Sequence, residues 1–172
     1  MKKIIGGLIL ACTFISCDQQ KTGYVNTEKI VKEYKTMAVT QDTYAKMNDA
    51  LMAELEQKAK AYQSQVEEYQ KNQSSMKASE REKAEQNLMA QRQQLQQEQQ
   101  TRGSQIQQES QAAIDSIISK VKNEVKAYGK SNGYDFIYGQ NDAGSIMYGK
   151  EEYDVTDDVI AVLNKSSKDS IK

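Results

Sequence analysis

The sequence has 172 residues and contains no histidine, no proline and no tryptophan. Without histidine, the chain lacks the side chain that most often transfers protons near neutral pH and most often binds metals. Without proline, no ring removes a backbone N–H donor, so helices can continue over long distances. Hydrophobic residues make up only 38% of the chain, which is too little for a thick globular core. These absences argue against an enzyme and favour an elongated, helical protein.

Cysteine is also scarce, since Cys12 and Cys17 are the two cysteines of the chain. The rest of the chain therefore cannot form a disulfide, a zinc cluster or a thiol nucleophile. Acidic pairs at 67–68 and 151–152 have no partners at ligand spacing, so we interpret them as solvated charge. The formal net charge is -1, and the chain lacks the basic excess that nucleic-acid binding requires. We expect no metal site and no nucleic-acid partner.

Residues 1–16 have the pattern of a bacterial export signal. Two lysines precede an apolar stretch, residues 4–15, that is too short to span a bilayer. The motif FISC at residues 14–17 looks like a lipobox, in which a small residue precedes the cysteine that becomes acylated. We therefore predict lipidation at Cys17, followed by a short tether, residues 17–22. Acylation at Cys12, after a very short apolar region, and secretion without a lipid are the alternatives.

Residues 27–76 contain nothing that breaks a helix, and Asn26 or Thr27 is placed to cap its start. Apolar residues recur there at steps of three or four, which predicts one helix of a coiled-coil-like pair. The residues of this stripe are Tyr44, Met47, Leu51, Leu55, Ala59, Tyr62, Val66, Tyr69 and Met76. The stripe pauses at about residues 74–79, where we expect the chain to reverse.

A second helix is predicted to begin at Ser79, because Glu82 stands three residues later as in a capping box. It should end near Gly129, a plausible C-cap. Its stripe consists of Ala84, Leu88, Leu95, Arg102, Ile106, Ala113, Ile117, Val121, Val125 and Tyr128. The two helices should match in length, at about 45 residues each, and form an antiparallel arm of roughly 60–70 Å.

Both ends of the chain predict a small β-rich body, which makes the fold class α+β. A short strand begins at Gly23, and residues 134–138 and 145–148 read as two strands of a hairpin joined by GQNDAG. A last helix should start at Thr156, in an acidic first turn, and end near Asn164. We expect residues 165–172 to be disordered.

Three strands and a short helix cannot bury enough apolar surface alone, so the body should assemble with other copies. We assign residues 23–30 and 131–164 to this body and residues 31–130 to the arm. The predicted oligomer interface consists of the apolar strand residues Tyr24, Val25, Phe136, Ile137, Tyr138, Ile146, Met147 and Tyr148.

Three motifs, in this order around a helical hairpin, resemble the Skp/OmpH family. They are GYVNTEKI at residues 23–30, GYDFI at 133–137 and DVTDDVI at 154–160. The resemblance implies a homotrimer whose arms enclose unfolded outer-membrane β-barrel proteins in the periplasm. It also implies a chaperone that holds its clients without ATP, a cofactor or chemistry.

The chain departs from the family pattern in being slightly acidic and in carrying the lipidation motif, which would anchor it to the inner or outer membrane. Residues 70–92, around the predicted reversal, nevertheless contain five basic and three acidic residues. The slightly acidic net charge puts electrostatic capture of clients by the whole surface in doubt. The basic excess at residues 70–92 leaves a local basic rim at the end of the arm.

Flexible methionines and amphipathic tyrosines near the end of the arm are candidate client contacts, because they adapt to many apolar partners. Most of them also fit the seam between the two helices, and Met76 and Met89 are the two without an obvious seam partner. The candidates are Tyr62, Tyr69, Met76, Leu88 and Met89.

Gly103 interrupts the second helix and is either a hinge of the arm or a small residue that faces Met52 across the hairpin. The glutamine-rich run at residues 86–111 reads as a solvated helix face rather than an aggregation signal. The alternative function is a lipid-anchored coiled-coil scaffold of the cell envelope. Polar residues at core-like positions suit flexible arms better than a rigid strut. They are Gln65, Gln73, Gln91, Gln99 and Arg102.

Overall fold

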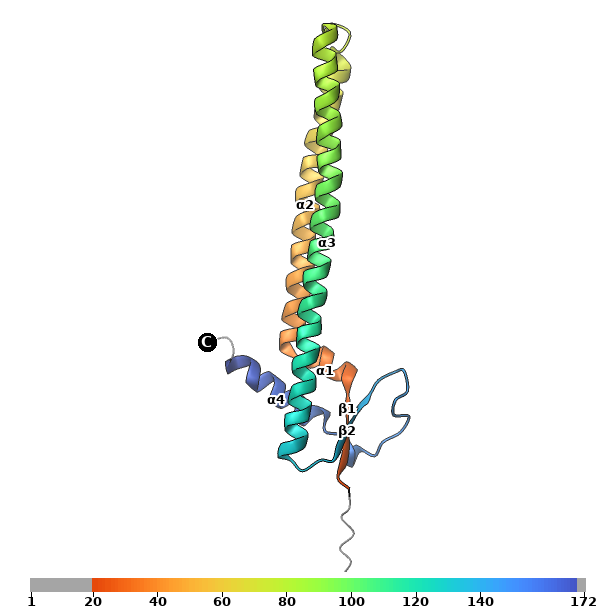
Figure 1. Ribbon diagram of the computed structural model, residues 1–172, viewed down its shortest axis with the longest axis vertical. Helices are drawn as coiled ribbons and strands as arrows, with labels where there is room; N and C mark the ends of the chain where they lie inside the picture. Colours follow the sequence, from red (N-terminus) through yellow and green to blue (C-terminus); the bar gives the residue numbers. More distant parts are fainter. Residues whose placement is uncertain (1–19, 170–172) are drawn as a thin grey trace, which may run out of the picture.

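Two long antiparallel helices dominate the computed structural model, which describes residues 20–169 (Figure 1). Helix α2 (Lys35–Asn72) leads away from a small body, and α3 (Ala78–Ser131) returns to it. The predicted export signal and Cys17 lie outside the described residues. The predicted α+β fold, a helical hairpin on a small body, is confirmed.

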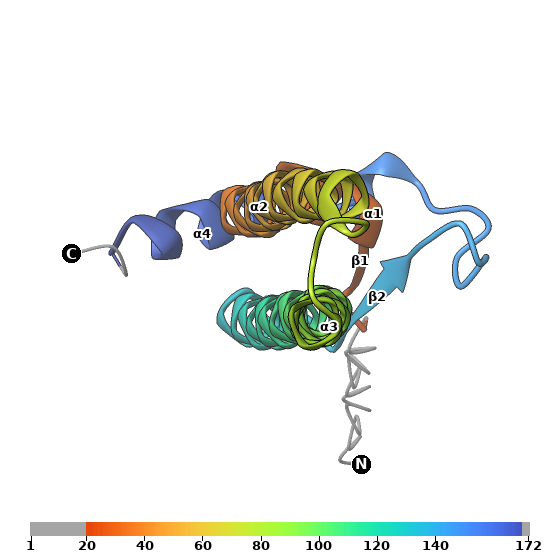
Figure 2. The same ribbon diagram turned by 90° about the horizontal axis from the view of Figure 1, so that it is seen from above.

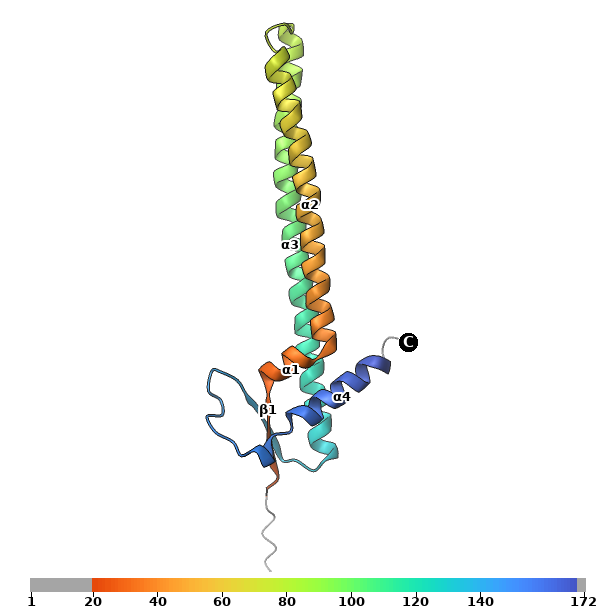
Figure 3. The same cartoon turned by 180° about the vertical axis from the view of Figure 1, so that it is seen from behind.

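The two helices of the arm differ in length, contrary to the prediction of matched helices. Helix α2 has 38 residues, which corresponds to about 57 Å. Helix α3 has 54 residues, because its lower end continues past the start of α2 and packs into the body. Figure 3 shows α4 lying across this lower end of α3.

The chain reverses at residues 73–77, but not with the predicted cap. The side chain of Glu80 accepts a hydrogen bond from the backbone N–H of Lys77, at 3.0 Å, so the helix is capped at Lys77, two residues before the predicted cap Ser79. Glu80 and Glu82 both lie near the start of the helix, and Glu80, which is nearer to the turn, caps it. The predicted capping box is therefore wrong by two positions.

The predicted continuous helix from residue 27 is interrupted at Tyr34. Asn26 caps the short helix α1 (Thr27–Glu33), as predicted, by accepting a hydrogen bond from the backbone N–H of Lys29 at 2.8 Å. Tyr34 then takes an extended conformation, with φ -75° and ψ 110°.

The break at Tyr34 is held by a contact from the far end of the chain. The side chain of Asn164 accepts a hydrogen bond from the N–H of Lys35, at 3.0 Å, and donates one to the carbonyl of Glu33, at 3.2 Å. These bonds replace backbone bonds that a continuous helix would have made. A residue 129 positions away thus decides where α1 ends.

The sheet differs from the predicted hairpin. Strand β1 (Thr22–Asn26) pairs in parallel with β2 (Phe136–Gln140), with Tyr24 opposite Tyr138. Residues 145–148 form no strand, because the loop after β2 is held by other contacts. The backbone N–H of Asp142 donates to Glu28 at 2.9 Å, and Gly149 lies so close to the Tyr24 ring that a Cβ would approach Cε1 to 2.4 Å.

Helix α4 (Thr156–Asp169), which follows the 3₁₀ turn η1 (Glu151–Tyr153), closes the core of the body. Val159 and Leu163 are almost completely buried against Ile30 and Tyr34. The helix runs past the predicted end near Asn164, so residues 165–169 of the predicted tail are helical, and residues 170–172 lie outside the described part. The hydroxyl of Tyr128 on α3 donates to Asp158 on α4, at 3.0 Å. Burial, together with this bond, raises the pKa of Tyr128 to about 12.

The predicted C-cap Gly129 lies inside α3 instead. A Cβ there would come within 3.2 Å of Ile137, so Gly129 allows β2 to approach the helix. The residue with the backbone expected of a terminating glycine is Gly133, at φ 68°.

Candidate functional site

The five predicted client contacts lie along the upper half of the arm, and three of them share one hollow. Tyr69, Met76 and Leu88 line a depression of about 480 Å³ between α2 and α3, next to the reversal. Met76 is half-buried there, so it does have neighbours in the seam. Tyr62 lines the next hollow towards the body, with Leu95. Met89 lies outside both hollows and is 57% exposed.

The phenol of Tyr69 joins the two helices at this hollow by donating a hydrogen bond to the carboxylate of Glu85. That bond, together with partial burial, raises the pKa of Tyr69 above its ordinary value. The tyrosine is therefore protonated throughout the physiological range. It presents an aromatic face to the hollow while its polar end is satisfied by α3.

The seam of the arm is thin. Among the described residues of α2 and α3, only Met37, Leu51, Ile117 and Gly129 are buried. Of these, Leu51 alone lies well away from the body. The predicted stripe is otherwise half-buried, and Met47 and Ala59 are exposed. Such a seam holds two helices side by side without locking them together.

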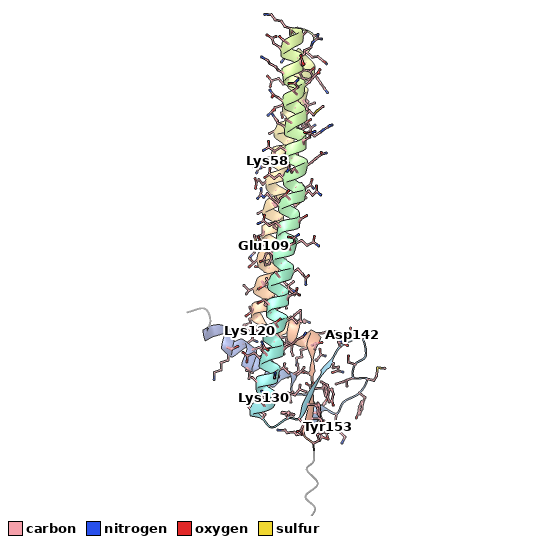
Figure 4. The ribbon with its side chains drawn as sticks, in the orientation of Figure 1. Lys58, Glu109, Lys120, Lys130, Asp142 and Tyr153 are labelled. Atoms are coloured by element: carbon pink, nitrogen blue, oxygen red, sulfur yellow. The ribbon has the colours of Figure 1, made fainter. Side chains whose placement is uncertain are left out.

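Four charged side chains bridge the helices at the middle of the arm. Lys58 contacts Glu54 and Glu98 at 2.8 and 2.7 Å, and Arg102 contacts the same two carboxylates at 2.8 and 2.7 Å. Hydrogen bonds from Lys58 and Arg102 lower the pKa of both Glu54 and Glu98. Figure 4 places Lys58 on this stretch.

The sequence reasoning recognised Arg102 as a polar seam position but missed the network around it. A signal was present, because Glu54 with Lys58 and Glu98 with Arg102 are both spaced i,i+4. That spacing predicts a pair on each helix. Only the packing of α2 against α3 places the two pairs opposite each other.

Gly103 follows this network directly. A Cβ added there would meet nothing within 4 Å, so the packing across the hairpin does not require a small residue and the Met52 alternative is wrong. Helix α3 passes through Gly103 without interruption. The hinge remains a prediction.

The predicted interface residues divide into buried and exposed groups. Val25 belongs to the core of the body, Tyr24 is buried, and Ile137 packs against the core. Phe136 and Tyr138 lie on the other face of β2, where their rings stack with centroids 5.9 Å apart. Both side chains are about half exposed. The most exposed candidates are in the loop after β2, where Met147 is 89% and Tyr148 is 82% exposed. Ile146, in the same loop, is half-buried.

A strongly apolar groove of about 440 Å³ lies where the arm meets the body, and sequence reasoning did not anticipate it. Most of its lining comes from α1, α3 and β2, with Val25 of β1 and Met37 of α2, and no local pattern connects these elements. Tyr34 lines the groove, is fully buried, and its hydroxyl has no hydrogen-bond partner among the described residues.

Within residues 20–169, no cluster of acidic, cysteine or histidine side chains is arranged to hold a metal ion. None of the helices in that part of the chain is long and apolar enough to cross a membrane. The candidate surfaces of the described chain are thus apolar hollows and charged helix faces.

The fold and these surfaces define a body with a protruding helical arm, and comparisons with known proteins name its class. A family model described as outer membrane protein (OmpH-like) matches residues 21–163. The chain therefore belongs to the OmpH-like (Skp/OmpH) family. The predicted family is confirmed.

Among solved structures, six chains match. One is an OmpH-like outer membrane chaperone candidate from Caulobacter crescentus CB15, with a TM-score of 0.77 and 13% identity over 96% of this chain and 90% of that chain. No curated protein sequence gives a match. At 13% identity, the likeness to this structural neighbour shows a shared fold.

Proposed function

We propose that the protein is a holdase chaperone that binds unfolded outer-membrane proteins in the cell envelope and keeps them from aggregating without ATP. The single observation that carries this proposal is the arm. It is a long helical hairpin whose seam is mostly half-buried, and it carries tyrosine and methionine side chains in open hollows near its end. Flexible apolar side chains on an adaptable scaffold suit clients that have no fixed shape.

The proposed assembly is a homotrimer built on the body. A two-stranded sheet is marginal alone. The exposed side chains of Phe136, Tyr138, Met147 and Tyr148 supply apolar surface that another copy would cover. Three arms around one body would then surround a client. Light scattering should give three times the protomer mass for residues 18–172, the mature chain without the predicted acylated cysteine.

The proposed location is the periplasm, with Cys17 acylated and anchored in the inner or outer membrane. The motivation is the FISC motif and the leader before it. Fatty-acid labelling and detergent partitioning of the wild type, Cys17→Ala and Cys12→Ala measure this directly. Loss of label in Cys17→Ala alone supports the site, and label that depends on Cys12 would move it.

The decisive experiment for the chaperone role is the turbidity of a urea-unfolded outer-membrane β-barrel protein after dilution, with stoichiometric protein and no nucleotide. We expect turbidity to be suppressed. Met89→Ser, near the end of the arm, should weaken suppression, whereas Met52→Ser should not. Met52 is a matched control, because it is 51% exposed on the same arm but lies far from the reversal.

The alternative is a lipid-anchored scaffold without clients. Aggregation that proceeds equally fast with and without the protein would refute the chaperone role and favour this alternative. Equal effects of Met89→Ser and Met52→Ser would instead place the client contacts outside the end of the arm.

A further inference from the structure

The loop between β2 and η1, residues 141–150, is a fixed projection. Its first part is held by the hydrogen bond from Asp142 to Glu28, and its last part by the close packing of Gly149 against Tyr24. Between them, Gly144 turns the chain at φ 84°. Met147 and Tyr148 project from this loop and are the most exposed large hydrophobic residues of the described chain.

The groove at the root of the arm is the matching concave surface. Its floor includes Ile30 and Tyr34, which are almost completely buried, and its rim includes Val31 at 41% and Ile118 at 38% exposure. The polar side chains that line it are Thr27, Tyr34 and Lys122. An occupant must therefore be mainly apolar.

The loop cannot fill the groove of its own protomer in this conformation. None of residues 141–150 lines the groove. Figure 2 shows the loop leaving the body on the side of β2 and extending away from both helices of the arm. A loop that fills the groove with Met147 and Tyr148 would therefore have to come from a second copy of the chain.

The stretch of α3 that lines one side of the groove and the segment that carries the loop have opposite net charges. The lower end of α3, residues 117–131, carries four lysines and one glutamate, and Lys122 borders the groove. The segment at residues 142–154 carries four carboxylates and one lysine. Figure 4 shows Lys120 and Lys130 on α3 and Asp142 on the projecting loop. Opposite charge around an apolar contact steers and aligns association.

We propose that the loop of one copy inserts Met147 and Tyr148 into the groove between α1, α3 and β2 of the next copy. The contact joins two different surfaces, so it is heterologous, and successive copies close into a ring. This inference rests on the proposed homotrimer and names the surfaces that build it.

The test uses residues 18–172, the mature chain without the predicted acylated cysteine, in two variants. The loop variant carries Met147→Ser and Tyr148→Ser, and the groove variant carries Val31→Asp and Ile118→Asp. All four positions are exposed in the protomer, so both variants should fold, which circular dichroism checks. Each alone should be a monomer at a concentration where the wild type is a trimer. Met89→Ser, an exposed change on the arm, should stay trimeric.

Mixing the two variants is the decisive step. A loop-deficient copy retains its groove and a groove-deficient copy retains its loop, so one intact contact forms per pair. The mixture should give a species of twice the protomer mass. A trimeric loop or groove variant overturns the inference, and so does a mixture of folded variants that stays monomeric.

These outcomes separate the inference from the proposed function. A monomeric wild type overturns this contact together with the homotrimer. A trimeric wild type with a trimeric loop variant overturns the contact alone. The chaperone role is measured independently, by the turbidity of the client with wild-type protein.

Discussion

The arm and the body share helix α3, yet they are held together differently. The body buries Ile30, Tyr34, Val159 and Leu163 almost completely around α4. The arm extends from this core and, away from the body, buries Leu51 alone among its described residues. Side chains in the seam are otherwise half-buried, and a charged network takes the place of apolar packing at Glu54 and Arg102.

This difference implies that the two regions open independently. Local stability follows buried apolar contacts, so the arm should separate or bend at a much lower free energy than the body unfolds. An arm that opens easily around a body that stays folded suits a protein that encloses clients of different sizes. The following predictions test this contrast, from the largest expected effect to the smallest.

Leu163→Ala should destabilise the body most. Leu163 is fully buried on α4, and removing a buried leucine side chain costs about 2–5 kcal/mol in free energy of unfolding. Chemical denaturation measures the change. Val162→Ala is the matched control, since Val162 is 38% exposed and should change stability by less than about 0.5 kcal/mol. Equal effects at both positions would show that α4 is not packed as described.

Glycine-to-alanine substitutions should have opposite signs in the two regions. Gly149→Ala places a Cβ against the Tyr24 ring in the body and should destabilise the protein by about 1–3 kcal/mol. Gly103→Ala meets open space in α3 and should stabilise the helix by up to about 1 kcal/mol.

Thermal denaturation and hydrogen exchange of the arm amides measure the two glycine variants. If Gly103 is a hinge, its alanine variant should also accept a narrower range of client sizes. A destabilised Gly103→Ala would contradict the open surroundings of that residue.

Tyr34→Phe should leave the body equally stable or stabilise it by about 1 kcal/mol. The hydroxyl of Tyr34 is buried without a partner, and removing an unsatisfied polar group recovers its desolvation cost. Denaturant titration measures the change. A clear loss of stability would mean that the hydroxyl has a partner in the assembled protein, which repeating the titration on the monomeric loop variant would reveal.

The charged network should give the smallest effect, confined to the arm. Because the pKa of Glu54 and of Glu98 is lowered in the folded state, the network stabilises fully above the ordinary value of 4.5, and this contribution is lost as pH falls through the lowered value. The protection factors of the arm amides, which compare observed exchange with the intrinsic rate at the same pH, should therefore fall on acidification and at high salt.

Arg102→Ala should abolish much of this pH and salt dependence. The control is Glu56→Ala, which removes the exposed pair with Lys60 on α2 without touching α3. If both variants respond to salt equally, the network does not join the two helices of the arm.

The helical hairpin could be predicted because its signals are local and repeated. The stripe from Tyr44 to Met76 and its partner on α3 fix which faces meet, and the absence of proline lets both helices continue. Three of the predicted client contacts, Tyr69, Met76 and Leu88, line one hollow for the same reason. The capping of α3 by Glu80, and not by the predicted Glu82, shows that a local pattern can place a helix start wrongly by two residues.

The body could not be predicted in the same detail, because its contacts join distant segments. The strand pattern at residues 145–148 is genuine as a local pattern, but Glu28 and Tyr24 hold that loop in another conformation. The groove at the arm root was missed since its lining comes from five separate elements.

The sequence alone determined the class of fold, the helical arm and the family, because hydrophobic periodicity and three short motifs are properties of the linear chain. Only the tertiary structure decided that the first helix breaks at Tyr34, where Asn164 supplies the missing hydrogen bonds. It also decided that β2 pairs in parallel with β1, although the whole arm separates the two strands in the sequence. The physical reason is that a backbone group forms a hydrogen bond with the best-placed partner in space. A local sequence pattern carries no information about a residue more than a hundred positions away.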